Sequence, residues 1–364
     1  MAVLTVIFLL YFLFMVILLV GWKKATTIAP VSAPPKEIMI SVVIPVRNEE
    51  FNIGSLLNDL SRQEYRNFEV IVVNDDSEDE TLWAVSQSQL KNIHVIHSKG
   101  KGKKAAITAG VRAARGPVVV TTDADCSLTE DWLKQIRTQF MDQEVMMAFG
   151  GVRMSGTDSF FNMLQKMEFA SLIGSGAATG AMGMPTMCNG ANMAFRKKVF
   201  SEVKGYDGNI NVPSGDDEFL LHKIHKRYPD GIRFIGSADA VVTTTVQPDR
   251  DAFINQRVRW ASKWRYNTSR FSQAVAVIVI LFQVAFIANW FLIFTPFILQ
   301  SLFYIAIKII LEAAFLLQVC RFLKIRWKWL TFFSLQVIYP FYVIGIGAAS
   351  FFRPFEWKHR IFKP

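Results

Sequence analysis

The run ISVVIPV at residues 40–46 decides the fold, together with three similar runs that follow it: FEVIVV (68–73), IHVI (93–96) and PVVVTTD (117–123). The runs are short and rich in β-branched residues, and they are separated by stretches of helical pattern near residues 50–62, 79–90 and 103–114. Short apolar strands that alternate with helices are typical of a parallel sheet with crossover helices. We therefore predict an α/β layer in a domain that starts near Ile38. A Gly-rich and Met-rich stretch at 174–193 gives no periodicity that predicts a helix or a strand.

Apolar segments at both ends of the chain predict a membrane protein. Hydrophobic residues make up 51% of the chain, charged residues only 19%, and the apolar residues are concentrated at the two ends. Residues 2–20 carry no charge and reach the ~20 residues that a helix needs to cross the hydrocarbon core. A secretory signal peptide is the alternative, but no basic region precedes the run, and the run exceeds the usual apolar core of ~7–15 residues. We predict a transmembrane helix over residues 1–22.

The segment after this helix sets the predicted orientation. Residues 23–37 contain several prolines and no apolar period, which indicates an extended linker. Lys23 and Lys24 stand at its start, so the positive-inside rule places the N-terminus outside and the following domain in the cytoplasm.

The C-terminal part, residues 271–352, predicts two or three hydrophobic helices with a break near Pro296. Three full crossings from the cytoplasm would put the basic tail, residues 353–364, outside, against the positive-inside rule. One segment is therefore expected to be re-entrant or interfacial, and the stretch 329–352 is the first candidate. Lys308 and Glu312 are four residues apart, so they either pair inside the bilayer or mark a functional site there.

Charge and cysteine content exclude some classes of protein. The formal net charge is +10, but many of the Lys and Arg residues flank apolar segments, where they would meet anionic lipid headgroups rather than nucleic acid. The three cysteines, Cys126, Cys188 and Cys320, have no spacing typical of disulfides or zinc sites. This fits a reducing cytoplasm.

Acidic residues follow two of the predicted strands. In open α/β sheets, ligands bind beyond the carboxyl ends of the strands. Asp75, in VVNDDSEDET (72–81), can accept a hydrogen bond from the imide N–H of a pyrimidine, although a turn or helix cap is the alternative. Asp123 and Asp125, in TTDADC (121–126), can bracket Mg²⁺ or Mn²⁺ together with diphosphate oxygens.

Two further motifs lie later in the chain. In SGDDEFLLHKI (214–224), acidic residues precede a helical pattern, a position that the helix dipole favours. FINQRVRWASKWR (253–265) predicts an amphipathic interfacial helix over residues 253–266. Within it, Arg259 can also neutralise a leaving diphosphate and Trp260 can stack on a sugar. The stretch SKGKGKKAAITAG (98–110) lacks the spacing of an NTPase phosphate loop, but Lys103 can contact a nucleotide.

Taken in this order, the motifs resemble the family 2 glycosyltransferases, in the membrane branch that includes cellulose, chitin and hyaluronan synthases and ceramide glucosyltransferase. The resemblance covers about residues 38–268 and implies a GT-A fold, a Rossmann-like domain with a mainly parallel mixed sheet. SVVIPVRNEE (41–50) is similar to the opening strand of the family. It implies a nucleotide pocket lined by the residues after that strand, namely Pro45, Arg47, Asn48 and Glu49.

The resemblance also assigns roles to the later motifs. It implies that Asp75 contacts the base, that Asp125 with Asp123 beside it holds the metal, and that Asp217 is the catalytic base. The family's Gln-x-x-Arg-Trp signature is matched by Gln256, Arg259 and Trp260. One departure is Asp76, where many relatives have glycine.

What the resemblance implies is a metal-dependent enzyme that transfers a sugar, with inversion, from a nucleotide-sugar, a UDP-sugar by analogy, to a lipid-linked acceptor or a growing glycan. Processive polysaccharide synthesis, transfer of one sugar to a lipid, and a non-catalytic transport or scaffold role stay open as hypotheses. The expected location is a bacterial inner (plasma) membrane with the catalytic domain in the cytoplasm, and an oligomer or a partner subunit is left open.

Overall fold

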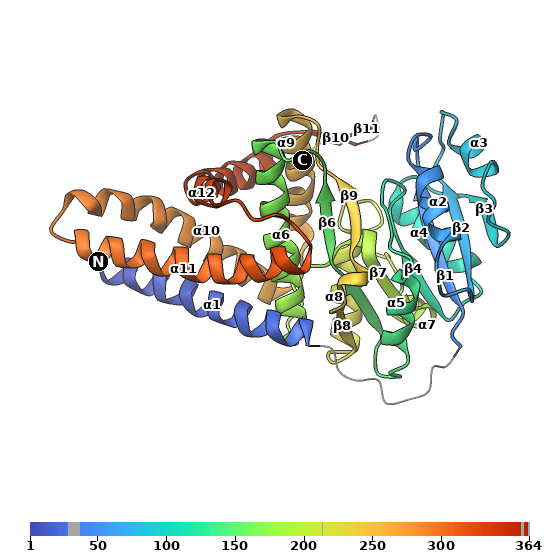
Figure 1. Ribbon diagram of the computed structural model, residues 1–364, viewed down its shortest axis with the longest axis horizontal. Coiled ribbons are helices and arrows are strands. Elements are labelled where there is room, and N and C mark those ends of the chain that lie inside the picture. The colour runs from blue at the N-terminus through green and yellow to red at the C-terminus, as the bar shows by residue number, and fades with distance from the viewer. Residues whose placement is uncertain (28–36, 213, 358–359, 363–364) are drawn as a thin grey trace.

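The computed structural model describes residues 1–27, 37–212, 214–357 and 360–362. Most of the predicted linker and part of the predicted basic tail lie outside these residues. Figure 1 shows a sheet domain at one end of the molecule and long helices at the other, with the N-terminus at the far end of the helices.

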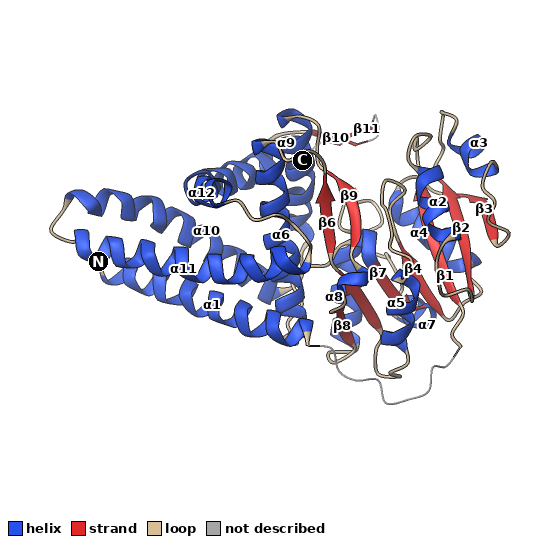
Figure 2. Cartoon of the chain, in the orientation of Figure 1, coloured by secondary structure: helices blue, strands red, loops and turns tan. Residues whose placement is uncertain are grey.

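The described residues form a seven-stranded mixed sheet in the order β3-β2-β1-β4-β7-β5-β8. All neighbouring strands in it pair in parallel except β7, which runs antiparallel to both β4 and β5. Figure 2 shows helices on both sides of this sheet. The strands are β1 (Ile40–Val46), β2 (Phe68–Asn74), β3 (Ile93–His97), β4 (Val118–Thr121), β5 (Met147–Gly150), β7 (Met193–Arg196) and β8 (Ile232–Ile235). The predicted α/β class with a mainly parallel sheet is confirmed.

Helices cover the sheet because its interior strand β1 is apolar on both faces. Val42 and Ile44 of β1 pack on one face with α2 (Ile53–Ser61) and α5 (Trp132–Phe140). Val43 packs on the other face with α4 (Lys103–Ala113). Other elements of the domain are α3 (Thr81–Ser86), α7 (Lys197–Glu202), α8 (Asp216–Arg227) and a parallel pair, β6 (Val152–Ser155) with β9 (Val242–Thr245).

The Gly-rich stretch without a predicted structure begins inside a long helix, α6 (Phe160–Ala181). Glycine weakens an isolated helix, so the helix was not predicted from sequence. Close contacts explain its glycines: Gly174 packs against α11 (Ile298–Phe322), and Gly176 and Gly180 pack against Met187 and Phe149 of the domain, while Gly21 of α1 (Ala2–Thr26) packs against α6. A Cβ at Gly174 would lie 2.5 Å from Val319 Cγ2, and a Cβ at Gly21 would lie 2.5 Å from the carbonyl oxygen of Ala178.

Among the described residues, four helices are long and apolar enough to cross a membrane: α1, α10 with the turn after it (Arg270–Phe294), α11, and α12 (Trp329–Phe352). This confirms the prediction of apolar helices at both ends of the chain. Lys308 Nζ lies 2.9 Å from Glu312 Oε1, as the spacing of the two residues predicts. Tyr11 of α1 also donates a hydrogen bond to Glu312, at 2.7 Å.

The helix α12 differs from the other three because both of its ends are bound to the sheet domain. Lys328, just before the helix, donates to the carbonyl oxygen of Asp158 at 2.9 Å. Arg265 donates to the carbonyl oxygen of Phe351, in the last turn, at 2.7 Å. Figure 1 shows α12 foreshortened beside α6 and α9 (Arg250–Ser262), whereas α1, α10 and α11 extend along the long axis of the molecule.

Candidate active site

The predicted site residues gather at the edge of the sheet where β1, β2 and β4 end. The carboxyl ends of parallel strands meet at one edge, so loops far apart in sequence are brought together there. A cavity of about 980 Å³ opens at this edge. All the predicted site residues except Asn48 line it: Pro45, Arg47, Glu49, Asp75, Lys103, Asp123, Asp125, Asp217, Gln256, Arg259 and Trp260. Asn48 instead binds a neighbouring loop, accepting a hydrogen bond from the Glu78 N–H at 2.9 Å.

The loop after β2 is shaped by Arg47. Its guanidinium donates to the carbonyl oxygens of Asp75 and Asp76, both at 2.8 Å. The Asp75 carboxylate accepts from the Gly102 N–H at 2.9 and 3.0 Å, which ties the loop to the start of α4. Asp76 has φ of +55°, in the left-handed region. Glycine, which the resemblance leads us to expect at this position, adopts that conformation without strain.

Lys103 bridges two of the acidic motifs. Its ammonium lies 2.6 Å from Asp123 Oδ1 and 3.4 Å from Asp216 Oδ2. Burial alone would lower the pKa of Lys103, but the two carboxylates outweigh burial and raise the pKa above its usual value. Lys103 therefore stays charged at the place where the strand-end carboxylates meet α8.

Asp125 lies deeper in the cavity beside other carboxylates. Burial, and then the charges of Asp123 and Glu49, raise its pKa above the usual value. Thr244 donates to Asp125 Oδ2 at 3.2 Å. A divalent cation would relieve the repulsion between these like charges. Within the part of the chain that the structure describes, no group of three or more His, Cys, Asp or Glu side chains could hold a metal, so diphosphate and water would supply the remaining ligands of a cation here.

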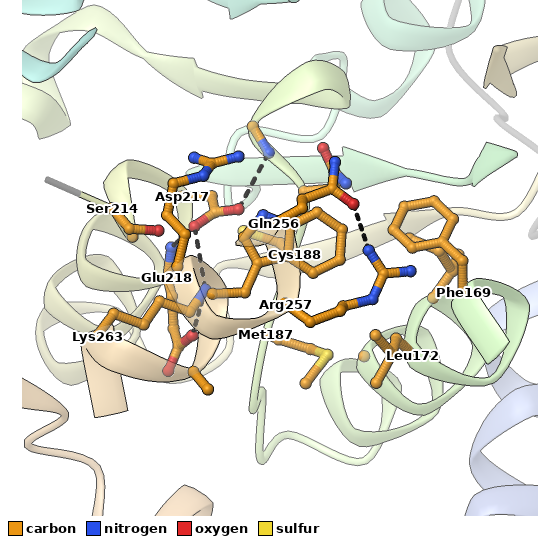
Figure 3. A pocket seen from close by; sticks show the side chains of 18 of the residues that line it. Phe169, Leu172, Met187, Cys188, Ser214, Asp217, Glu218, Gln256, Arg257 and Lys263 are labelled. Carbon is orange, nitrogen blue, oxygen red and sulfur yellow. Dashed lines mark hydrogen bonds and ion pairs between the residues drawn. The ribbon is translucent and has the colours of Figure 1, made fainter. Parts of the chain in front are cut away.

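Asp217 lies in the first turn of α8. Gly215, the residue just before this helix, has a φ of +79°, in the left-handed region that glycine adopts without strain. Asp217 Oδ1 accepts from the Glu218 N–H at 2.7 Å and Asp217 Oδ2 from the Gly190 N–H at 3.3 Å. Lys263 Nζ lies 3.7 Å from Asp217 Oδ1 (Figure 3). These contacts fix the orientation of the carboxylate in the cavity.

Lys263 was not predicted as a site residue. Its ammonium lies 2.8 Å from Glu218 Oε2, and Asn267 donates to Glu218 Oε1 at 2.7 Å. Burial would raise the pKa of Glu218, but Lys263 and the hydrogen bonds outweigh burial and lower it to about 2. The sequence contains one signal for Lys263, because it lies four residues after Arg259 and so falls on the same face of the helix predicted over 253–266. In the structure α9 ends at Ser262, and Lys263 begins a short 3-10 turn.

Arg257, within the Gln-x-x-Arg-Trp signature, contacts the side chains of Glu168, Gln256 and Trp260. It forms a two-pronged pair with Glu168 of α6, at 2.6 and 3.3 Å, and lies 4.3 Å over the ring of Trp260. It also donates to the Gln256 side chain, as Figure 3 shows. Trp260 therefore has one face covered by Arg257. Burial lowers the pKa of Arg259 although Asp216 and Asp123 lie nearby.

Among the sequence comparisons, the family match covers the first part of the sheet domain. Residues 41–204 match the family described as Glycosyl transferase family 2. The chain is 26% identical over 226 residues to the poly-β-1,6-N-acetyl-D-glucosamine synthase of Staphylococcus aureus, covering 61% of this chain and 53% of that protein. It is 32% identical over 141 residues to glycosyltransferase AglE of Haloferax volcanii, covering 35% and 46%. The chain thus spans about half the length of the curated relatives it matches.

A solved structure resembles nearly the whole chain. The mannosyltransferase PcManGT of Pyrobaculum calidifontis, solved with GDP-Man and Mn²⁺, matches with a TM-score of 0.59 at 18% identity and covers 96% of both chains. At this identity the likeness concerns the fold, and it confirms the predicted GT-A fold.

Proposed function

We propose that this chain, which carries a family 2 glycosyltransferase domain, transfers a sugar with inversion from a nucleotide-sugar to a membrane-associated acceptor. One observation carries the proposal: a single cavity joins the strand-end carboxylates Asp75 and Asp125 to the helices that can enter a membrane. A non-catalytic transport or scaffold role would not require Asp217 to be held in this cavity.

The donor is proposed to bind at the strand-end side of the cavity. Asp75 would accept from the base, and Lys103 and Arg259 would face the diphosphate with opposite charge. Asp123 and Asp125 would hold a divalent cation, which when bound supplies positive charge to the leaving nucleoside diphosphate. The two neighbouring carboxylates and the raised pKa of Asp125 fit such a cation.

The acceptor is proposed to react beside Asp217. This carboxylate would take the proton from the acceptor hydroxyl while the hydroxyl oxygen attacks the anomeric carbon. Lys263 Nζ lies 3.7 Å from Asp217 Oδ1 and 2.8 Å from Glu218 Oε2, so it would place a positive charge beside the proposed base. One displacement of this kind inverts the anomeric configuration.

Nucleoside diphosphate release from a panel of donors tests this function. The full chain, reconstituted with membrane lipids, is expected to release UDP from at least one UDP-sugar, and EDTA is expected to reduce the rate at least tenfold, with recovery on addition of Mn²⁺ or Mg²⁺. Turnover of GDP-sugars alone would overturn the UDP assignment. No turnover of any donor would overturn the enzyme, and full activity in EDTA would overturn the cation.

We further propose an orientation in the membrane. The domain, residues 38–268, would lie in the cytoplasm, with α1, α10 and α11 crossing the membrane and α12 lying along its cytoplasmic side. The two ends of α12 support this, because a straight crossing of 24 residues would separate them by about 36 Å across the bilayer. This arrangement keeps Arg353 on the cytoplasmic side, in agreement with the positive-inside rule.

Single cysteines at three exposed positions test the orientation. We expect Arg353→Cys to react with a membrane-impermeant maleimide from the same side as Phe51→Cys in the domain, and Phe294→Cys, after α10, to react from the opposite side. Whole cells and inverted vesicles give the two sides. Labelling of Arg353→Cys together with Phe294→Cys would make α12 a fourth crossing.

A further inference from the structure

The cavity has a second half, which contains none of the residues proposed to bind the donor or to act as the base. Beyond Asp217 it continues between α10 (Arg270–Phe291) and α12. The walls there are mainly aliphatic and come from both helices: Val275, Ala276, Val279, Ile280, Val343, Ile344, Ile346, Gly347 and Ala348. The same two helices carry exposed apolar residues outside the cavity, among them Val277 and Phe341.

We propose that this half of the cavity holds the hydrocarbon chain of a membrane lipid whose hydroxyl-bearing headgroup is the acceptor. The proposal rests on the proposed function and names the class of its acceptor. Such a lipid would keep its chain in the apolar half of the cavity while its headgroup reaches Asp217. The chain therefore never has to enter water.

A growing glycan fits these walls less well. Sugar hydroxyls that leave water need hydrogen-bond partners, and aliphatic side chains offer none. Several hydroxyls among the lining residues are already bonded within the protein: Tyr342 donates to Glu168 at 3.0 Å, and Ser350 donates to the Gly347 carbonyl at 2.7 Å. The lining thus favours a hydrocarbon chain.

Two glycines of α12 provide a matched pair of variants. Gly347 lines the cavity and Gly345 does not. A Cβ added at either position would meet no atom within 4 Å, so a larger side chain is tolerated at both. Residues two apart in a helix are rotated by about 200° around its axis, so side chains at positions 345 and 347 would point in nearly opposite directions. Gly347→Leu is therefore expected to fill the cavity, and Gly345→Leu to leave it open.

A photoreactive lipid analogue tests the proposal. The full chain in phospholipid nanodiscs is irradiated with dodecyl β-glucoside carrying a diazirine on its chain, and labelled peptides are mapped. We expect labels on residues 275–280 and 343–348 in the wild type and in Gly345→Leu, reduced at least fivefold in Gly347→Leu. Equal labelling of these segments in both variants, or loss of the label to a competing free oligosaccharide, overturns the proposal.

Measuring hydrolysis of the donor by water distinguishes a failure of the lipid site from a failure of the proposed function. Release of nucleoside diphosphate to water needs no lipid, so it is expected to be equal in Gly345→Leu and Gly347→Leu, while transfer to dodecyl glucoside falls at least tenfold in Gly347→Leu only. If no donor is hydrolysed but the labelling pattern holds, only the proposed function fails. If hydrolysis is normal and both variants transfer equally, only the lipid site fails.

Discussion

Replacing Asp217 with asparagine is expected to lower the rate of sugar transfer by a factor of roughly 10² to 10⁴, the range that general base catalysis contributes. The amide has nearly the same shape as the carboxylate and can still accept from the Gly190 N–H, so the fold around α8 is kept. What is lost is the ability to take a proton from the acceptor. The rate is measured as nucleoside diphosphate release at saturating donor and acceptor.

Two controls make this result specific. Asp239→Asn changes an exposed carboxylate away from the cavity and is expected to leave the rate within about twofold of the wild type. Donor affinity of Asp217→Asn, measured by calorimetry, is expected to be unchanged within about threefold, because Asp217 is proposed to act on the acceptor. A rate for Asp217→Asn within twofold of the wild type would remove it from the role of base.

The sheet and the position of the site were accessible from sequence. The strands β1 and β4 are nearly continuous apolar runs because both of their faces are buried. Parallel strands then bring Asp75 and Asp123 to one edge without further information. Their roles, like that of Asp217, stay predictions. By contrast, the Gly-rich end of α6 could not be predicted, because its glycines are required by close contact with Val319, Met187 and Phe149, whose positions depend on the tertiary fold.

Long-range pairs were also inaccessible. Glu168 is a single acid in an apolar stretch, and its partner Arg257 lies 89 residues later in a helix rich in cations. Spacing along one helix identifies candidates such as Lys263, but it cannot say which cation faces which carboxylate across the fold. In the same way, the sequence predicted that residues 329–352 do not form an ordinary crossing. It did not indicate that both ends of this helix are hydrogen-bonded to the sheet domain.

Replacing Arg257 with methionine is expected to destabilise the protein by about 3–5 kcal/mol, because it leaves Glu168 as a buried charge without its partner. Arg257 and Glu168 are 2% and 6% exposed, and Tyr342 of α12 donates to the same carboxylate, so the pair joins α6, α9 and α12. The loss is expected to appear as a lower midpoint of thermal unfolding in detergent, whatever substrate is present.

A second variant distinguishes the ion pair from simple loss of packing. If the unpaired charge causes the effect, Glu168→Gln combined with Arg257→Met recovers most of the lost stability, because a neutral amide with Tyr342 as partner tolerates burial. If packing of Arg257 on the Trp260 ring dominates, the double variant stays as unstable as Arg257→Met alone, since methionine cannot replace the guanidinium on that ring. Recovery in the double variant would therefore show that the unpaired charge of Glu168, rather than lost packing of Arg257, destabilises the single variant.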